Sequence, residues 1–155
     1  MTPLFKKMNF KEQEAIYVLQ APDSFLPELK EMGKSTAVKT SLKGAKQLPF
    51  FIGFVTKQKE VDELAQAIGA LVQADEVIWF AYPKGTSKKF TCEFNRDTGW
   101  KELGKVGFEG VRMVAIDEDW SALRFRRAEN IKTMKRSFAM SKEGKAKVKK
   151  TLRKK

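Results

Sequence analysis

The feature that most constrains the fold is a pair of uninterrupted apolar runs separated by an amphipathic segment. The runs are Phe50–Thr56, "FFIGFVT", and Val77–Tyr82, "VIWFAY". Because neither run alternates apolar with polar residues, each predicts a strand that is covered on both faces of its sheet. Between them, Lys59–Val72 repeats apolar residues at helical spacing and predicts a helix. A strand, a helix and a second buried strand are the unit of a parallel sheet.

Further elements are expected on both sides of this unit. The strand signals are Ala15–Gln20, Thr36–Thr40, Val111–Ile116 and Ala122–Arg127. A helix is expected to begin after Asp23 or Ser24, with Asp23 as a good N-cap, and a weaker helix covers Thr98–Lys105. The last two strands are joined by only a few acidic residues, so they predict an antiparallel hairpin.

These elements predict one α/β domain over residues 1–130, with three layers and a Rossmann-like, mostly parallel sheet closed by the C-terminal antiparallel hairpin. The link from Ser41 to Pro49 is too short for a helix crossover. It leaves open whether the second and third strands pair antiparallel or lie apart. Residues 131–155 are predicted to be a basic tail that is largely disordered.

The charge of the chain is concentrated in that tail. Residues 131–155 contain eleven basic residues and one acidic residue, which leaves 20 basic and 18 acidic residues in the rest of the chain. Blocks of like charge are a common feature of segments that bind nucleic acid through its phosphates. The candidate contacts are Lys142, Lys145, Lys147, Lys149, Lys150, Arg153 and Lys154. A tail that only increases solubility and a tail that binds another acidic partner are the alternatives.

The composition excludes several kinds of chemistry. The sequence contains no histidine and one cysteine, Cys92. This removes the usual general base, the nucleophile pairs that depend on histidine, and multi-thiolate metal sites. No apolar run reaches membrane-spanning length, and the first residues lack the apolar core of a signal peptide. We therefore expect a cytoplasmic protein with no membrane partner, no bound metal and no cofactor.

Several segments together resemble a bacterial family of unknown function, the DUF3052 family. They are "TPLFKKMNF", "YVLQAPDSF", "FFIGFVT", "VIWFAYPKG" and "AIDEDWSALRFR". The resemblance covers residues 2 to about 130. Its most specific parts are the Pro83-Lys84 turn and the hairpin from Asp117 to Ser121. It implies a bacterial, intracellular α/β protein and no particular activity.

The order of elements also resembles the C-terminal half of class I S-adenosylmethionine-dependent methyltransferases. Such an enzyme needs a glycine-rich turn after its first strand, where the backbone must approach the cofactor. Here that turn is Ala21–Phe25, and the next glycine is Gly33. The second strand is followed by Thr40–Leu42, without the acid that would bind the ribose. The resemblance therefore implies the fold of these enzymes without their cofactor motifs.

A ligand site is a second functional hypothesis, because ligands of open α/β sheets bind beyond the carboxyl ends of the strands. The residues expected at that edge are Asp23, Thr56, Lys84, Thr86 and Ser87, with Tyr82 and Cys92 as further lining candidates. Each of these residues also has an ordinary structural interpretation. Lys84, for example, lies in a Pro-Lys-Gly sequence, which is common in turns. The acidic run Asp117–Asp119 has the oxygens to bind Mg²⁺, but its position in a hairpin favours a turn.

From the sequence, the leading hypothesis is a non-enzymatic protein whose tail binds nucleic acid non-specifically. The alternative is a small-ligand-binding or methyltransferase-like domain with its site at the strand ends near Lys84.

Overall fold

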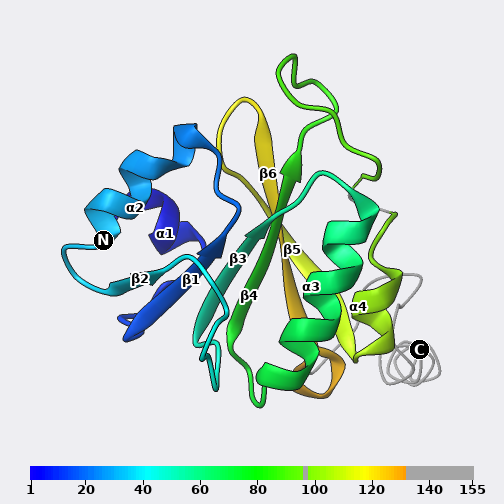
Figure 1. Cartoon of the computed structure of the whole chain (residues 1–155), viewed down its shortest axis with the longest axis horizontal. Helices are drawn as coiled ribbons and strands as arrows, with labels where there is room; N and C mark the ends of the chain where they lie inside the picture. The colour runs from blue at the N-terminus through cyan, green and yellow to red at the C-terminus, as the bar shows by residue number, and fades with distance from the viewer. Residues whose placement is uncertain (96–97, 132–155) are drawn as a thin grey trace, which may run out of the picture.

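In the computed structural model, the described residues are 1–95 and 98–131, and they form a six-stranded sheet with helices on both faces (Figure 1). The candidate nucleic-acid contacts from Lys142 to Lys154 therefore lie outside the described residues. None of the described helices has the length and apolar character needed to cross a membrane.

The strand order of the sheet is β2-β1-β3-β4-β6-β5. The bounds of the strands are β1 Ala15–Leu19, β2 Ala37–Lys39, β3 Phe50–Phe54, β4 Val77–Pro83, β5 Phe108–Ala115 and β6 Trp120–Arg127. β2, β1, β3 and β4 pair in parallel, and β6 pairs antiparallel with both β4 and β5. The expected α/β fold with a closing antiparallel hairpin is confirmed. The question left open by the short link is also answered, because β2 and β3 lie on opposite sides of β1.

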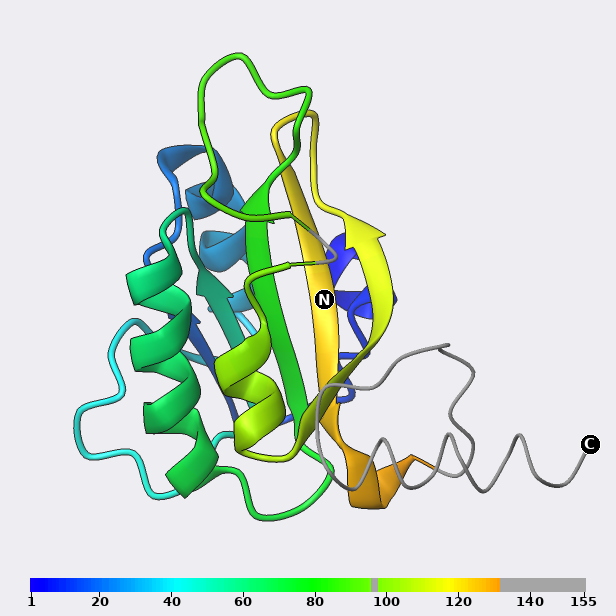
Figure 2. The same ribbon diagram turned by 90° about the vertical axis from the view of Figure 1, so that its right-hand side faces the viewer.

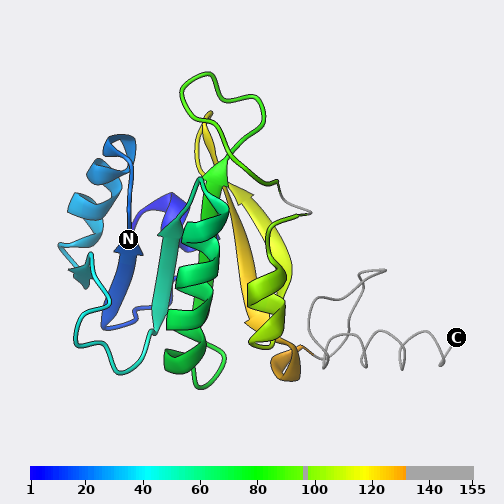
Figure 3. The same ribbon diagram turned by 45° about the vertical axis from the view of Figure 1, so that its right-hand side comes forward.

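The helices are α1 Pro3–Lys7, α2 Leu26–Met32, α3 Gln58–Leu71 and α4 Lys101–Lys105, with short 3-10 turns at Asp23–Phe25 and Ala128–Asn130. Figure 3 shows α3 in front of β3 and β4, and α4 in front of the β5–β6 pair. Helix α1 was not predicted. It begins after Thr2, whose Oγ1 accepts a hydrogen bond from the N–H of Phe5 at 3.2 Å.

Two apolar cores separate the layers. In one, Phe51 and Phe80 of the central strands pack with Ile68 of α3 and Leu103 of α4. In the other, Phe50, Ile52 and Trp79 pack with residues of α1 and α2. Every residue of β3 and β4 is buried, as the uninterrupted apolar runs predicted.

Gly53 lets α3 approach β3 closely. A Cβ atom at this position would lie 3.0 Å from Leu64 Cδ1, so a side chain here would force the Leu64 side chain of α3 to shift. Side chains along β3 and β4 point alternately to the two faces of the sheet, and both faces are covered. The carboxyl end of β4 faces the loops (Figure 2).

Candidate pocket beyond strand β4

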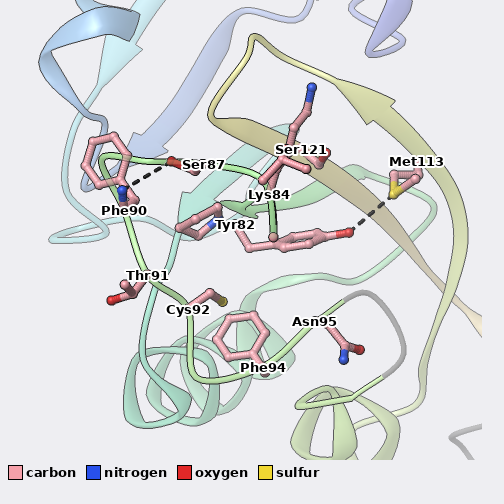
Figure 4. Close-up of a pocket in the computed structure, with 13 residues that line it drawn as sticks. Tyr82, Lys84, Ser87, Phe90, Thr91, Cys92, Phe94, Asn95, Met113 and Ser121 are labelled. Atoms are coloured by element: carbon pink, nitrogen blue, oxygen red, sulfur yellow. Dashed lines mark hydrogen bonds between the residues drawn. The ribbon is translucent and has the colours of Figure 1, made fainter.

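A pocket of about 680 Å³ lies at the carboxyl end of β4 (Figure 4). Its walls come from the end of β4, the loop that follows it, and single residues of β5 and β6. The lining residues are Tyr82, Pro83, Lys84, Gly85, Thr86, Ser87, Phe90, Thr91, Cys92, Phe94, Asn95, Met113 and Ser121. Aromatic rings and sulfur atoms alternate with hydroxyl and amide groups, which is the usual composition of a small-molecule site.

One wall is the turn after β4, which is fixed to the β5–β6 hairpin. The N–H of Lys84 donates to the carbonyl of Asp119 at 2.8 Å, and Ser87 Oγ donates to Asp119 Oδ1 at 2.8 Å. Ser87 Oγ also accepts from the N–H of Phe90 at 3.1 Å, which folds the loop back over the strand end. Figure 2 shows this loop beside the hairpin turn beyond the ends of the strands.

Asp117 organises the hairpin turn itself. Its Oδ1 accepts from the N–H groups of Asp119 at 2.8 Å and Trp120 at 2.9 Å. The turn interpretation of the acidic run is therefore confirmed. Among the described residues, no group of three or more histidine, cysteine or acidic side chains is arranged to hold a metal ion.

The opposite wall is aromatic. The hydroxyl of Tyr82 donates to Met113 Sδ at 3.2 Å, which joins β4 to β5 across the mouth of the pocket. The centroid of the Phe94 ring lies 5.0 Å from that of Trp100 and 6.3 Å from that of Tyr82. Phe94 is therefore held in the core on one side and lines the pocket on the other. Gly99 makes room for Phe94, because a Cβ at Gly99 would lie 2.6 Å from Phe94 Cβ.

The polar chemistry of the pocket comes from a thiol, hydroxyl and amide groups, and one lysine. Burial raises the pKa of the Cys92 thiol, and the charges of Glu93 and Glu60 raise it further. A hydrogen bond with the backbone of Phe94 has the opposite effect and lowers the pKa. Lys84 is the charged residue among the described lining residues. Figure 4 shows its side chain extending away from Cys92 and Phe94.

The structure brings together three of the five residues predicted for a strand-end site. Lys84, Thr86 and Ser87 all line the pocket, and so do the further candidates Tyr82 and Cys92. Ser87 is occupied by the hydrogen bonds that hold the loop, so its place in the wall is mainly structural.

Asp23 and Thr56 do not line the pocket. The N–H and Oγ1 of Thr56 both donate to Glu60 Oε1, at 2.9 and 3.2 Å, which fixes the start of α3. Asp23 is exposed and begins a 3-10 turn, and α2 starts only after Phe25, without a side-chain cap. The prediction of Asp23 as the N-cap of this helix was wrong, because a 3-10 turn is inserted before Leu26.

The lining residues that were not predicted from the sequence are Phe90, Thr91, Phe94, Asn95, Met113 and Ser121. Phe90, Cys92 and Phe94 alternate along "KFTCEFN", which is a period-two signal that could have marked one face of this loop. Met113 and Ser121 reach the pocket because β6 lies between β4 and β5, and no local pattern reports that strand order.

The chain matches no protein-family model and no curated protein. The solved structures with a similar arrangement include the following three. A putative type 11 methyltransferase from Sulfolobus solfataricus gives a TM-score of 0.46 at 8% identity, over 81% of this chain and 89% of that one. Ribosomal protein L11 methylase from Lactobacillus delbrueckii subsp. bulgaricus gives 0.46 at 10% identity, over 74% of this chain and 58% of that one. A protein in the NADB-Rossmann superfamily from Streptococcus agalactiae gives a TM-score of 0.47 at 11% identity, over 82% of this chain and 68% of that one. These similarities carry no information about activity.

Proposed function

We propose that this protein binds a small organic molecule in the pocket beyond β4. The observation that carries the proposal is the pocket itself, whose volume of about 680 Å³ falls within the range of about 300–1,000 Å³ typical of small-molecule sites. It lies outside the carboxyl end of a parallel strand, where open α/β sheets bind ligands.

The lining chemistry selects the class of molecule. Phe90, Phe94 and Met113 offer surfaces on which a flat ring can pack, and Thr91, Ser121 and Asn95 carry hydroxyl or amide groups. No described lining residue is acidic, so nothing among them would balance a cation. We therefore propose an aromatic or heteroaromatic ligand with hydrogen-bonding groups and no positive charge.

Binding is proposed in preference to catalysis because of the groups that the pocket contains. A half-buried thiol with a raised pKa is protonated near neutral pH, so Cys92 is a poor nucleophile there. The sequence has no histidine to remove its proton.

The test is a thermal-shift panel of uncharged and anionic heteroaromatic compounds that includes nucleotides, with S-adenosylmethionine, whose sulfonium is positively charged, as a cationic comparison that should not bind. A compound present at 100 times its Kd should add about 2.7 kcal/mol to the free energy of unfolding. Met113→Ala should weaken binding. Val111→Ala is the matched control, because Val111 is also an exposed apolar residue of β5 but does not line the pocket. Equal binding by wild type and Met113→Ala would contradict the proposal.

A second function is proposed for residues 131–155, on the observation that they carry eleven basic residues against one acidic residue. We propose that they bind nucleic acid through its phosphates, without reading sequence. Replacing Lys142, Lys145, Lys147, Lys149, Lys150, Arg153 and Lys154 with glutamine should abolish binding of an oligonucleotide and flatten its salt dependence. The matched control replaces seven exposed lysines of the domain, Lys6, Lys7, Lys11, Lys30, Lys39, Lys43 and Lys46. Equal loss in both variants would contradict a specific role for the C-terminal residues.

We also propose that the chain belongs to the DUF3052 family. The two most specific parts of the resemblance, the Pro83-Lys84 turn and the hairpin at Asp119, are adjacent through the hydrogen bond from Lys84 N to the carbonyl of Asp119.

A further inference from the structure

A row of side chains crosses β4, β6 and β5 on the sheet face that carries α1. Arg124 of β6 is the Cα partner of Trp79 in β4 on one side and of Arg112 in β5 on the other. Trp79 belongs to the core beneath α1 and α2, and residues in register on neighbouring strands share a face. Two arginines therefore lie directly opposite each other at the edge of the sheet.

The residues that follow α1 hold both neighbours of Arg124. Trp79 Nε1 donates to the carbonyl of Met8 at 2.9 Å, and Arg112 Nη1 donates to Asn9 Oδ1 at 2.8 Å. Arg124 lies between these two anchored side chains and is half-buried. Its Nε is buried and has no hydrogen-bond partner among the residues the structure describes. A buried donor without a partner destabilises the folded protein, and the effect is larger when the donor is charged.

The charges at this point are not balanced. Burial lowers the pKa of Arg124, and the charges of Arg126 and Arg112 lower it further, while Asp75 raises it. Asp75, however, is hydrogen-bonded to Arg126, with its Oδ1 2.9 Å from Arg126 Nε. Glu109 is the Cα partner of Arg126. The two acidic groups, Asp75 and Glu109, therefore both lie beside Arg126. Like charges directly opposite each other destabilise a sheet.

We propose that Arg112 and Arg124 form a binding site for a phosphate group. A phosphate between the two guanidinium groups would accept hydrogen bonds from both and would balance their two like charges. This site is distinct from the pocket beyond β4, since side chains alternate along β5 and Met113 belongs to the other face. The phosphate group could belong to inorganic phosphate, to a mononucleotide or to a nucleic-acid backbone.

The test uses the full chain and measures phosphate affinity by titration calorimetry at constant ionic strength, with chloride as the balancing anion. Arg124→Met keeps most of the apolar stem and removes the guanidinium. Lys39→Met is the matched control, because Lys39 is an exposed cation on β2 at the opposite edge of the sheet. Phosphate should bind Arg124→Met about tenfold or more weakly than wild type, and Lys39→Met should match wild type.

Stability in phosphate-free chloride provides a second readout. Arg124→Met should unfold at the same temperature as wild type or higher, because it removes a like-charge pair and a buried donor without a partner. If that variant fails to fold, Arg112→Gln replaces it in the titration, since Arg112 is exposed. Adenosine monophosphate and a single-stranded oligonucleotide serve as further probes, and a tenfold loss for one of them identifies the source of the phosphate. The proposal would be overturned if wild type did not bind phosphate more tightly than chloride. It would also be overturned if the arginine variants bound phosphate as tightly as wild type.

Discussion

Ser87 Oγ donates a 2.8 Å hydrogen bond to Asp119 Oδ1, and this contact joins the loop after β4 to the turn between β5 and β6. The backbone reinforces it, since Lys84 N donates to the carbonyl of the same aspartate at 2.8 Å. The loop that forms one wall of the pocket is therefore positioned by a residue that lies outside the pocket. Asp119 is partly buried, so the contact is less screened than a surface pair.

We expect Ser87 and Asp119 to be energetically coupled. Asp119→Ala should lower the free energy of unfolding by about 1–3 kcal/mol, because it leaves the Ser87 hydroxyl without its charged acceptor. In a double-mutant cycle with Ser87→Ala, urea unfolding should give a coupling energy of about 1 kcal/mol. Glu118→Ala, at the exposed neighbouring position, should change stability by less than about 0.5 kcal/mol. Strict additivity of the Ser87 and Asp119 variants would contradict this account.

The thiol of Cys92 should titrate at higher pH in the folded protein than in the unfolded chain, because burial raises its pKa. The neutral thiol is then favoured by the folded state. Its contribution to stability is fully present below the pKa of the unfolded thiol and is lost as pH rises through the folded value. Rates of labelling with a disulfide reagent, measured over about pH 7–10 in buffer and in urea, test the order of the two titrations. A folded thiol that titrates below the unfolded one would be the contrary result.

Gly99→Ala should disrupt the aromatic wall of the pocket. The backbone at Gly99 has a φ of 88°, and the added Cβ would lie 2.6 Å from Phe94 Cβ. We expect a loss of about 2–4 kcal/mol in the free energy of unfolding, from backbone strain and from overpacking. Gly85→Ala is the control, since nothing lies within 4 Å of a Cβ at that position, and its stability should be within about 0.5 kcal/mol of wild type. Equal stability of the two variants in urea would refute the packing argument.

Gln20 is expected to be replaceable by glycine with a gain in stability. It follows β1 with a φ of 60°, a left-handed conformation that glycine adopts without steric cost. Gln20→Gly should therefore raise the free energy of unfolding by up to about 1 kcal/mol. Gln47→Gly, at an exposed loop position without a positive φ, should lower it by a similar amount. If both replacements destabilise the protein in thermal unfolding, the strain assigned to Gln20 is absent.

The local elements were largely predictable from the sequence because their signals are local. The runs at Phe50 and Val77 are apolar on both faces, and α3 carries its apolar residues at helical spacing, so period alone identifies them. Helix α1 was missed because it is a single short turn, stabilised by the Thr2 cap and by burial of Phe5 in the distant core.

The arrangement of the strands was harder to predict, and the composition of the pocket depends on it. Lys84, Thr86 and Ser87 follow β4 directly, so the strand-end rule was sufficient to place them together. Met113 enters the pocket only because β6 pairs between β4 and β5, which is a long-range choice. Thr56 was placed at the correct edge, but its polar groups are used to start α3.

The most direct measurement of ligand binding in the pocket uses Cys92, which is the one cysteine of the chain and lines the pocket. A compound that raises the unfolding temperature of wild type is added in increasing amounts, and the labelling rate of Cys92 is followed at fixed pH. Our account predicts that labelling slows in proportion to occupancy and reaches a plateau at saturation. A compound that saturates the protein and leaves the labelling rate of Cys92 unchanged would show that the ligand binds elsewhere, which contradicts the account.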